Sequence, residues 1–229
     1  MTNLEGILEN WRSERLPVTI ANRTRRVYDH LARIYPISSY LFHAKAHALA
    51  LDMAGIQDGM KVLEIAVGSG EMFSKIAARN PQGLNVGLDL SPQMAAATLD
   101  RLGKEHPEVN CTIEAADCRM MPFRDESFDG IVCCYLLELL ASSDIVKTLH
   151  EVNRVLKPGG TFTLIMIGQN LEYFNRAYRV ASKVVPAFLG QQMDQRGPEL
   201  LEACGFRVVS HQTVRQTLYP SRIVVSRRA

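Results

Sequence analysis

The stretch VLEIAVGSG, residues 62–70, combines an apolar run with one carboxylate, Glu64, and ends in Gly68-Ser69-Gly70. Residues 61–66 have the near-continuous apolar pattern of a strand that is buried on both faces. Glycines directly after such a strand let the backbone approach a ligand closely, and the next helix presents unpaired N–H groups. The stretch therefore predicts a ligand site at the carboxyl end of a buried strand, although a glycine-rich turn alone is a weak signal.

Strands and helices alternate along the rest of the chain. After the strand at 61–66, further strands are expected at 84–89, 109–114, 128–134, 161–167, 206–214 and 218–227. Helices are expected at 71–79, from Pro92 onward with Ser91 as N-cap, at 144–156 before a Pro158-Gly159-Gly160 stop, and at 198–204. This order predicts an α/β fold, with a doubly wound, mainly parallel, seven-stranded Rossmann-like sheet that carries helices on both faces.

Two segments fall outside this alternation. Residues 1–50 are rich in Arg and Tyr and are expected to form an α-helical N-terminal cap on the main domain, residues 51–229. Residues 168–197 are expected to form a helical lid, because they are much longer than the roughly 4–6 residues of an ordinary connection. The lid segment has an apolar face, which could also simply pack onto the domain: Leu171, Phe174, Tyr178, Ala181, Val185 and Phe188.

Composition excludes several classes of protein. The chain has 229 residues, 47% hydrophobic and 22% charged, which is enough to bury a core. A net charge of +2 is too small to indicate a nucleic-acid partner. The five cysteines lack C-x-x-C spacing, so neither a metal site nor a disulfide framework is expected. No apolar run approaches the roughly 18 residues of a spanning helix. A reduced, cytoplasmic protein is expected.

The residues around the glycines favour a cationic ligand. A dinucleotide fingerprint, G-x-G-x-x-G, needs a third glycine, but Phe73 stands there, and Glu71 would repel a pyrophosphate. Asp89 ends the second strand, 25 residues after Glu64, where a carboxylate can accept hydrogen bonds from both hydroxyls of a ribose. Asp117 follows the third strand. A charge-poor, cationic ligand therefore suits the site better than a pyrophosphate.

Four motifs in this order resemble the class I S-adenosylmethionine-dependent methyltransferases, in particular the ubiquinone/menaquinone methyltransferase-like group. They are VLEIAVGSG, VGLDLSPQM, AADCRMMPFRDESFDGIV and EVNRVLKPGGTF, and they span about residues 60 to 165. The resemblance implies S-adenosylmethionine as cofactor and a small-molecule acceptor. A catalytically silent S-adenosylmethionine-binding module and an NAD-dependent oxidoreductase are the alternatives.

The resemblance also implies roles for individual residues. Glu64, Gly68 and Gly70 would contact the methionine part of the cofactor, Asp89 the ribose, and Asp117 the adenine amino group. The full set of expected cofactor-binding residues is Glu64, Ala66, Gly68, Gly70, Asp89, Leu90, Met94, Asp117, Cys118 and Cys134. Structural alternatives stay open, because Glu64 could cap loop N–H groups, Asp89 could cap a helix, and Asp117 could belong to an ordinary turn. Ala66 departs from the family, which usually has a glycine there.

The expected reaction is an in-line displacement that needs a general base only if the acceptor must lose a proton. Weak candidates for that base are Tyr35, His43, His47 and Glu138, each of which could instead pack or cap a helix. The aromatic and aliphatic residues of the cap and lid favour a largely apolar acceptor, such as a quinone, a lipid or a secondary metabolite. Basic residues could flank it and touch the surface of a membrane, or be solvated helix faces: Arg23, Arg25, Arg26, Arg33, Arg176, Arg179 and Lys183.

Overall fold

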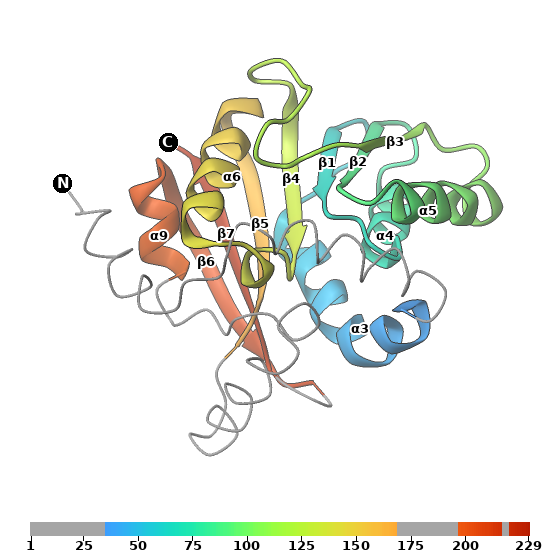
Figure 1. Ribbon diagram of the computed structural model, residues 1–229, viewed down its shortest axis with the longest axis horizontal. Coiled ribbons are helices and arrows are strands. Elements are labelled where there is room, and N and C mark those ends of the chain that lie inside the picture. Colours follow the sequence, from blue (N-terminus) through green and yellow to red (C-terminus); the bar gives the residue numbers. More distant parts are fainter. Residues whose placement is uncertain (1–34, 169–196, 217–219) are drawn as a thin grey trace.

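One seven-stranded sheet forms the centre of the protein (Figure 1). The computed structural model describes residues 35–168, 197–216 and 220–229, with the backbone alone for residues 35–42. The strands are β1 (Lys61–Ile65), β2 (Leu84–Asp89), β3 (Cys111–Ala115), β4 (Phe128–Cys134), β5 (Leu156–Ile167), β6 (Phe206–Val214) and β7 (Ser221–Arg228). Their order is β3-β2-β1-β4-β5-β7-β6. Strands β1 to β5 pair in parallel, whereas β7 runs antiparallel to β5 and β6, which confirms the predicted fold class.

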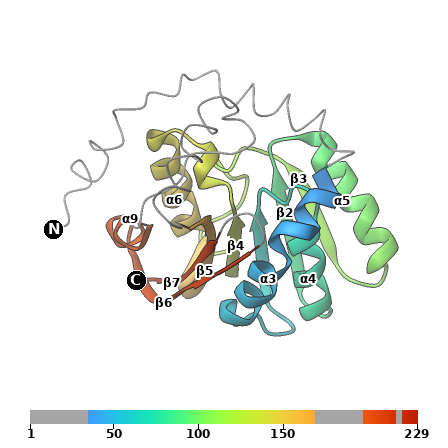
Figure 2. The ribbon, with the colours of Figure 1, turned by 90° about the horizontal axis from the view of Figure 1, so that it is seen from below.

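Helices cover both faces of the sheet. They are α3 (Tyr35–Ala54), α4 (Glu71–Arg79), α5 (Pro92–Glu105), the 3-10 helix η1 (Leu137–Leu139), α6 (Ser142–Val155) and α9 (Gly197–Ala203). Figure 2 shows α6 and α9 on one face and α3, α4 and α5 on the other. Helix α5 begins as the sequence predicts, because the Ser91 side chain accepts a hydrogen bond from the Met94 N–H and Pro92 occupies the first turn.

Two hydrophobic cores lie on opposite faces of the sheet. Leu63 and Ile65 of β1 belong to the core that includes Leu149 of α6, whereas Val62 belongs to the core that includes Ala50 of α3 and the first turns of α4. Successive side chains of a strand alternate between the two faces. Glu64 therefore shares the face of Val62, on the side of α3 and α4.

The fifth strand begins earlier than the sequence pattern indicates. Helix α6 ends at Val155, and Leu156 already pairs with Phe128 of β4. The pairing register then shifts between Phe128 and Gly130, so that residues 157–160 form an irregular, exposed part of β5. Gly159 has φ 73, which glycine adopts without steric cost. The expected turn is therefore a distortion inside the strand, which is typical of β-bulges.

Helix α3 joins the expected cap to the sheet. It runs through residue 50 and packs against β5, β7 and α4, so the boundary at residue 50 falls inside a helix. Residues 1–34 and 169–196 lie outside the described residues, and the cap and lid assignments stay predictions. Within the described ranges, no helix is both long and apolar enough to cross a bilayer.

Candidate functional site

The carboxyl ends of β1 and β4 mark the expected position of a ligand site. Strands β1 and β4 are neighbours in the sheet, but the chain proceeds outward from β1 to β2 and from β4 to β5. In open α/β sheets, ligands bind in the crevice at such a reversal of strand order. The glycine loop, residues 66–70, follows β1, and Tyr135 follows β4. These two segments form the sides of the candidate site.

Neighbouring elements hold the glycine loop in one conformation. The Gly68 N–H donates to Oδ2 of Asp89 at 2.9 Å, and the Gly68 carbonyl accepts from the Thr98 hydroxyl at 2.8 Å. Gly70 has φ 75, and a Cβ atom there would lie 2.6 Å from a Thr98 methyl carbon. Asp89 from β2 and Thr98 from α5 therefore determine the path of the loop.

Asp89 connects three parts of the site. Its second carboxylate oxygen, Oδ1, accepts the Ser91 N–H at 2.9 Å, and the side chain is almost fully buried. The N-cap of α5 is Ser91, as predicted, so Asp89 organises the turn before that helix instead of capping it. Each carboxylate oxygen can accept more than one hydrogen bond, and the position at the end of β2 fits the expected ribose contact.

Glu64 is a buried acid with unused hydrogen-bonding capacity. Its side chain is 1% exposed, and Oε2 has no hydrogen-bond partner among the described residues. Burial raises the pKa of Glu64 well above its usual range, and the negative charges of Asp89 and Glu71 add to this effect. No hydrogen bond joins Glu64 to the described part of the glycine loop, which disfavours a loop-capping role. A carboxyl with a raised pKa can release its proton when a cation arrives, and the resulting carboxylate then compensates the charge of that cation.

Arg119 is a site residue that sequence reasoning missed. Its guanidinium donates to both carboxylate oxygens of Asp117, with a distance of 2.6 Å from Nη2 to Oδ2, and its Nη1 donates to Asp144 at 2.8 Å. These hydrogen bonds lower the pKa of Asp117. Asp117 is therefore an ionised, oriented acceptor whose remaining lone pairs can face an amino group. The sequence signal for this ion pair is that Arg119 stands only two residues after Asp117.

The other expected cofactor residues differ in exposure. Leu90, directly after Asp89, is 38% exposed, whereas the Met94 side chain is buried under the first turn of α5. Cys118 lies in the core beside the Thr148 hydroxyl, and burial raises its thiol pKa to about 11. Burial also raises the pKa of Cys134 well above its usual range. Leu90 is therefore the exposed apolar side chain of this group. The raised pKa values keep the thiols of Cys118 and Cys134 neutral.

Three of the four candidate bases have described side chains, and all three are buried. His43 and His47 are buried on α3, and the side chain of Tyr35, which opens that helix, lies outside the described residues. Glu138, in η1, is fully buried, and its Oε1 accepts the Ile167 N–H at 2.6 Å. Burial raises the pKa of Glu138 to about 7, because water cannot solvate its charged form.

Tyr135 has an unusual backbone conformation. Its φ is 52, in the left-handed region that non-glycine residues rarely adopt. Its hydroxyl hydrogen-bonds to Ser221 Oγ at 2.6 Å and accepts the side-chain amide N–H of Gln216 at 3.2 Å. The ring stacks on His43, with 4.3 Å between ring centroids. Strained residues of this kind concentrate at functional sites. Nothing in the local sequence indicated this cluster, because its members are far apart along the chain.

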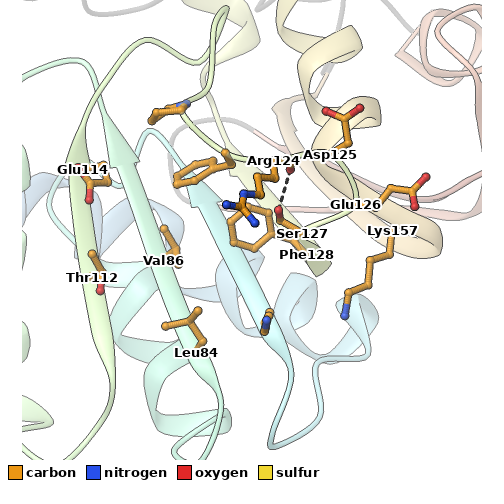
Figure 3. Close-up of a pocket in the computed structure, with 13 residues that line it drawn as sticks. Leu84, Val86, Thr112, Glu114, Arg124, Asp125, Glu126, Ser127, Phe128 and Lys157 are labelled. Carbon is orange, nitrogen blue, oxygen red and sulfur yellow. Dashed lines mark hydrogen bonds between the residues drawn. The ribbon is translucent and has the colours of Figure 1, made fainter.

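A hollow of about 560 Å³ lies beside β2, β3 and the loop that precedes β4 (Figure 3). Leu84 begins β2, Phe128 begins β4, and Lys157 lies near the start of β5, so the hollow is at the amino ends of the strands. It exists because residues 116–127, between β3 and β4, contain no helix to cover that part of the sheet. The hollow is therefore separate from the candidate site at the carboxyl ends of β1 and β4.

Known proteins resemble this chain over most of its length. Residues 62–160 match the family described as "Methyltransferase domain". A ubiquinone/menaquinone biosynthesis C-methyltransferase of Bordetella avium is 30% identical over 181 residues, covering 76% of this chain and 68% of that protein. The corresponding protein of Methylococcus capsulatus is 29% identical over 177 residues, with 75% and 71% of the two chains covered.

Solved structures show the same fold. The N-methyltransferase NodS of Bradyrhizobium japonicum, in complex with S-adenosyl-L-homocysteine, superposes with a TM-score of 0.72 over 90% of this chain and 98% of that one, at 14% identity. A SAM-dependent methyltransferase from Aquifex aeolicus gives a TM-score of 0.64, covering 91% and 98% of the two chains at 19% identity.

Replacing Ala66 by glycine is expected to stabilise the protein slightly. Ala66 has φ 58, and the left-handed region costs an L-residue roughly 1–2 kcal/mol. Part of this gain is lost, because glycine adds about 0.4–1 kcal/mol of entropy to the unfolded chain. Urea unfolding should therefore show an increase in the free energy of unfolding of up to about 1 kcal/mol. Ala97→Gly, in the exposed middle of α5, is the control and should destabilise by about 1 kcal/mol. A clear decrease in the free energy of unfolding of Ala66→Gly would mean that the alanine methyl makes a stabilising contact.

Replacing Glu138 by glutamine is expected to change how stability depends on pH. The unfolded carboxyl ionises near 4.5 and the folded one near 7, so the wild type loses stability as pH rises between these values. The loss attributable to Glu138 is roughly 3 kcal/mol, and it is constant above pH 7. The free energy of unfolding of Glu138→Gln, relative to that of the wild type, should therefore increase from pH 4.5 to 7. The pH dependence of the exposed Glu108→Gln should follow that of the wild type. Parallel curves for all three proteins in urea titrations would contradict a raised pKa.

Proposed function

Because the chain belongs to the class I S-adenosylmethionine-dependent methyltransferases, in the ubiquinone/menaquinone methyltransferase-like group, we propose that it methylates a ring carbon of a largely apolar quinol. Membership of the family makes the protein a methyltransferase with S-adenosylmethionine as cofactor. The proposal concerns the acceptor and the residues that hold each reactant. The relatives named as ubiquinone/menaquinone C-methyltransferases support a quinol acceptor.

The observation that carries the cofactor assignment is the group of acids around the glycine loop. Glu64, Glu71 and Asp89 are all buried, and the charges of Glu71 and Asp89 both raise the pKa of Glu64. Buried acids without full compensation are costly, and a cationic ligand offsets that cost. S-adenosylmethionine carries an ammonium and a sulfonium group, so this surrounding fits it better than it fits a pyrophosphate.

Different described residues would contact different parts of the cofactor. Glu64 and the glycine loop would face the methionine part, Asp89 the ribose hydroxyls, and Leu90 with Asp117 the adenine. When bound, S-adenosylmethionine supplies a methyl group that its sulfonium already activates. The protein therefore has to orient the acceptor and exclude water from the crevice, and positioning alone can be worth roughly 7–11 kcal/mol.

The acceptor would enter from the side of β4. The cofactor contacts come from β1, β2 and α5, which leaves the space next to Tyr135, Glu138 and α3 for the second reactant. The described part of α3 contributes aliphatic residues and the His43 ring, which stacks on Tyr135, and a quinol ring with an apolar tail would find matching surface there. A quinol is also a good carbon nucleophile once its hydroxyl is deprotonated.

Binding of S-adenosylmethionine is expected to release a proton from Glu64. The carboxyl keeps its proton while the site lacks a cation, and an ammonium group beside it favours ionisation. Titration calorimetry in phosphate and in Tris buffer should therefore give different apparent enthalpies, consistent with release of up to about one proton. Glu64→Gln should bind with the same apparent enthalpy in both buffers after correction for the cofactor itself. Equal buffer dependence in wild type and Glu64→Gln would remove Glu64 from the cofactor site.

The acceptor proposal can be tested with 1,4-naphthalenediol kept reduced under nitrogen. The full chain with S-adenosylmethionine should release S-adenosylhomocysteine, and mass spectrometry with NMR should show the new methyl group on a ring carbon. 1-Naphthylamine, a matched nitrogen nucleophile, should react far more slowly. Methylation of the amine in preference to the diol would contradict carbon methylation.

A further inference from the structure

Buried polar and aromatic side chains connect helix α3 to the segments that follow β1 and β4. His47 of α3 is 4% exposed, and its Nδ1 lies 3.4 Å from Oε1 of Glu71. Glu71 is the first residue of α4, directly after the glycine loop. On the other side, the His47 ring centroid lies 6.3 Å from that of Tyr135, which directly follows β4. His47 therefore lies between the two segments that border the crevice.

Glu71 is a fixed negative charge next to His47. Burial alone would raise its pKa, but the His47 ring and the Lys75 ammonium, 3.2 Å from Oε1, lower the pKa of Glu71 to about 2. A carboxylate beside Nδ1 favours the tautomer that has its proton on Nδ1, and this leaves a lone pair on Nε2. The distance of 3.4 Å is longer than an ordinary hydrogen bond, as is frequent before substrates bind. The same carboxylate would stabilise an imidazolium.

Nε2 of His47 has no hydrogen-bond partner among the described residues. Neither this atom nor Nδ1 makes an ordinary hydrogen bond to any described residue, although both are shielded from solvent. The neighbouring groups are engaged in other contacts, because the His43 ring stacks on Tyr135 and the Tyr135 hydroxyl binds Ser221 and Gln216. Burial and the proximity of His47 also lower the pKa of His43 to about 4, so His43 is uncharged. An unsatisfied buried polar atom costs roughly 1–3 kcal/mol, which a ligand hydroxyl can recover.

We propose that His47, oriented by Glu71, accepts the hydroxyl proton of the acceptor, an inference that rests on the proposed carbon methylation of a quinol. The acceptor O–H bond breaks, an N–H bond forms at Nε2, and the electron pair stays on oxygen, where it enriches the adjacent ring carbon. Glu71 balances the imidazolium charge. After methylation the ring carbon loses its hydrogen as a proton to water, and His47 returns its own proton to the oxygen. His47 is the catalytic base, and Glu71 is a positioning residue.

The first experiment measures binding to the full chain saturated with S-adenosylhomocysteine. Its probes are reduced 1,4-naphthalenediol and 1,4-dimethoxynaphthalene, which has the same ring without a hydroxyl proton. In ¹⁵N NMR of the imidazoles, the diol should shift the Nε2 signal of His47 and the dimethoxy compound should not. His47→Gln should weaken diol binding about tenfold, with ether binding and S-adenosylhomocysteine affinity unchanged within about twofold, which also shows that the variant folds. His150→Gln, exposed on α6, is the control.

The second experiment measures turnover of the diol. His47→Gln should lower kcat by roughly 10²–10⁴-fold with little change in the KM for S-adenosylmethionine, and added imidazole should restore part of the rate. Glu71→Gln should give a smaller loss of kcat, which imidazole does not restore. The inference is overturned if the diol fails to bind, if diol and ether bind wild type and His47→Gln alike, or if S-adenosylhomocysteine alone shifts Nε2. In contrast, diol binding at His47 without methyl transfer would overturn the proposed function and leave the hydroxyl contact standing.

Discussion

The carboxylate of Asp89 is the contact on which the geometry of the site depends. One of its oxygens accepts the N–H of Gly68 and the other accepts the N–H of Ser91. A single side chain at the end of β2 thus connects the loop after β1 to the first turn of α5. Ser91 in turn caps α5, and Thr98 of that helix binds the carbonyl of Gly68. This closed set of hydrogen bonds defines the path of the glycine loop, and a preformed loop lowers the entropy cost of binding.

The electrostatics of the site follow from where the acids are buried. Glu64 and Glu71 lie on the same face of the sheet as α3, close to Asp89, and water cannot screen them. The pKa values of these two glutamates shift in opposite directions, because their neighbours differ. Glu64 has no basic partner among the described residues and its pKa is raised, whereas His47 and Lys75 lower the pKa of Glu71. The charge of Glu71, on the side next to α3, can stabilise a protonated histidine.

Sequence reasoning was most accurate where local patterns are strong. Strands β2 and β4, helix α4 and the N-cap at Ser91 match their predicted positions. The start of β5 was wrong by five residues, because pairing with β4 carries the strand through Pro158 and two glycines that usually mark a turn. The family resemblance, which the comparisons confirm, placed the acids at the ends of β1, β2 and β3. It could not indicate that Arg119 holds Asp117.

By itself, the sequence determined the fold class, the position of the glycine loop and the identity of the cofactor. These features depend on periodicity and on motifs whose residues are close together in the chain, so each can be recognised without knowing the others. Only the tertiary structure decided which side chains meet across the crevice. The Tyr135 hydroxyl reaches Ser221, the Ala46 N–H reaches Gln216 at 3.4 Å, and His47 reaches Glu71. Contacts of this kind depend on how α3 packs against the sheet and against α4, and that packing is a property of the whole core.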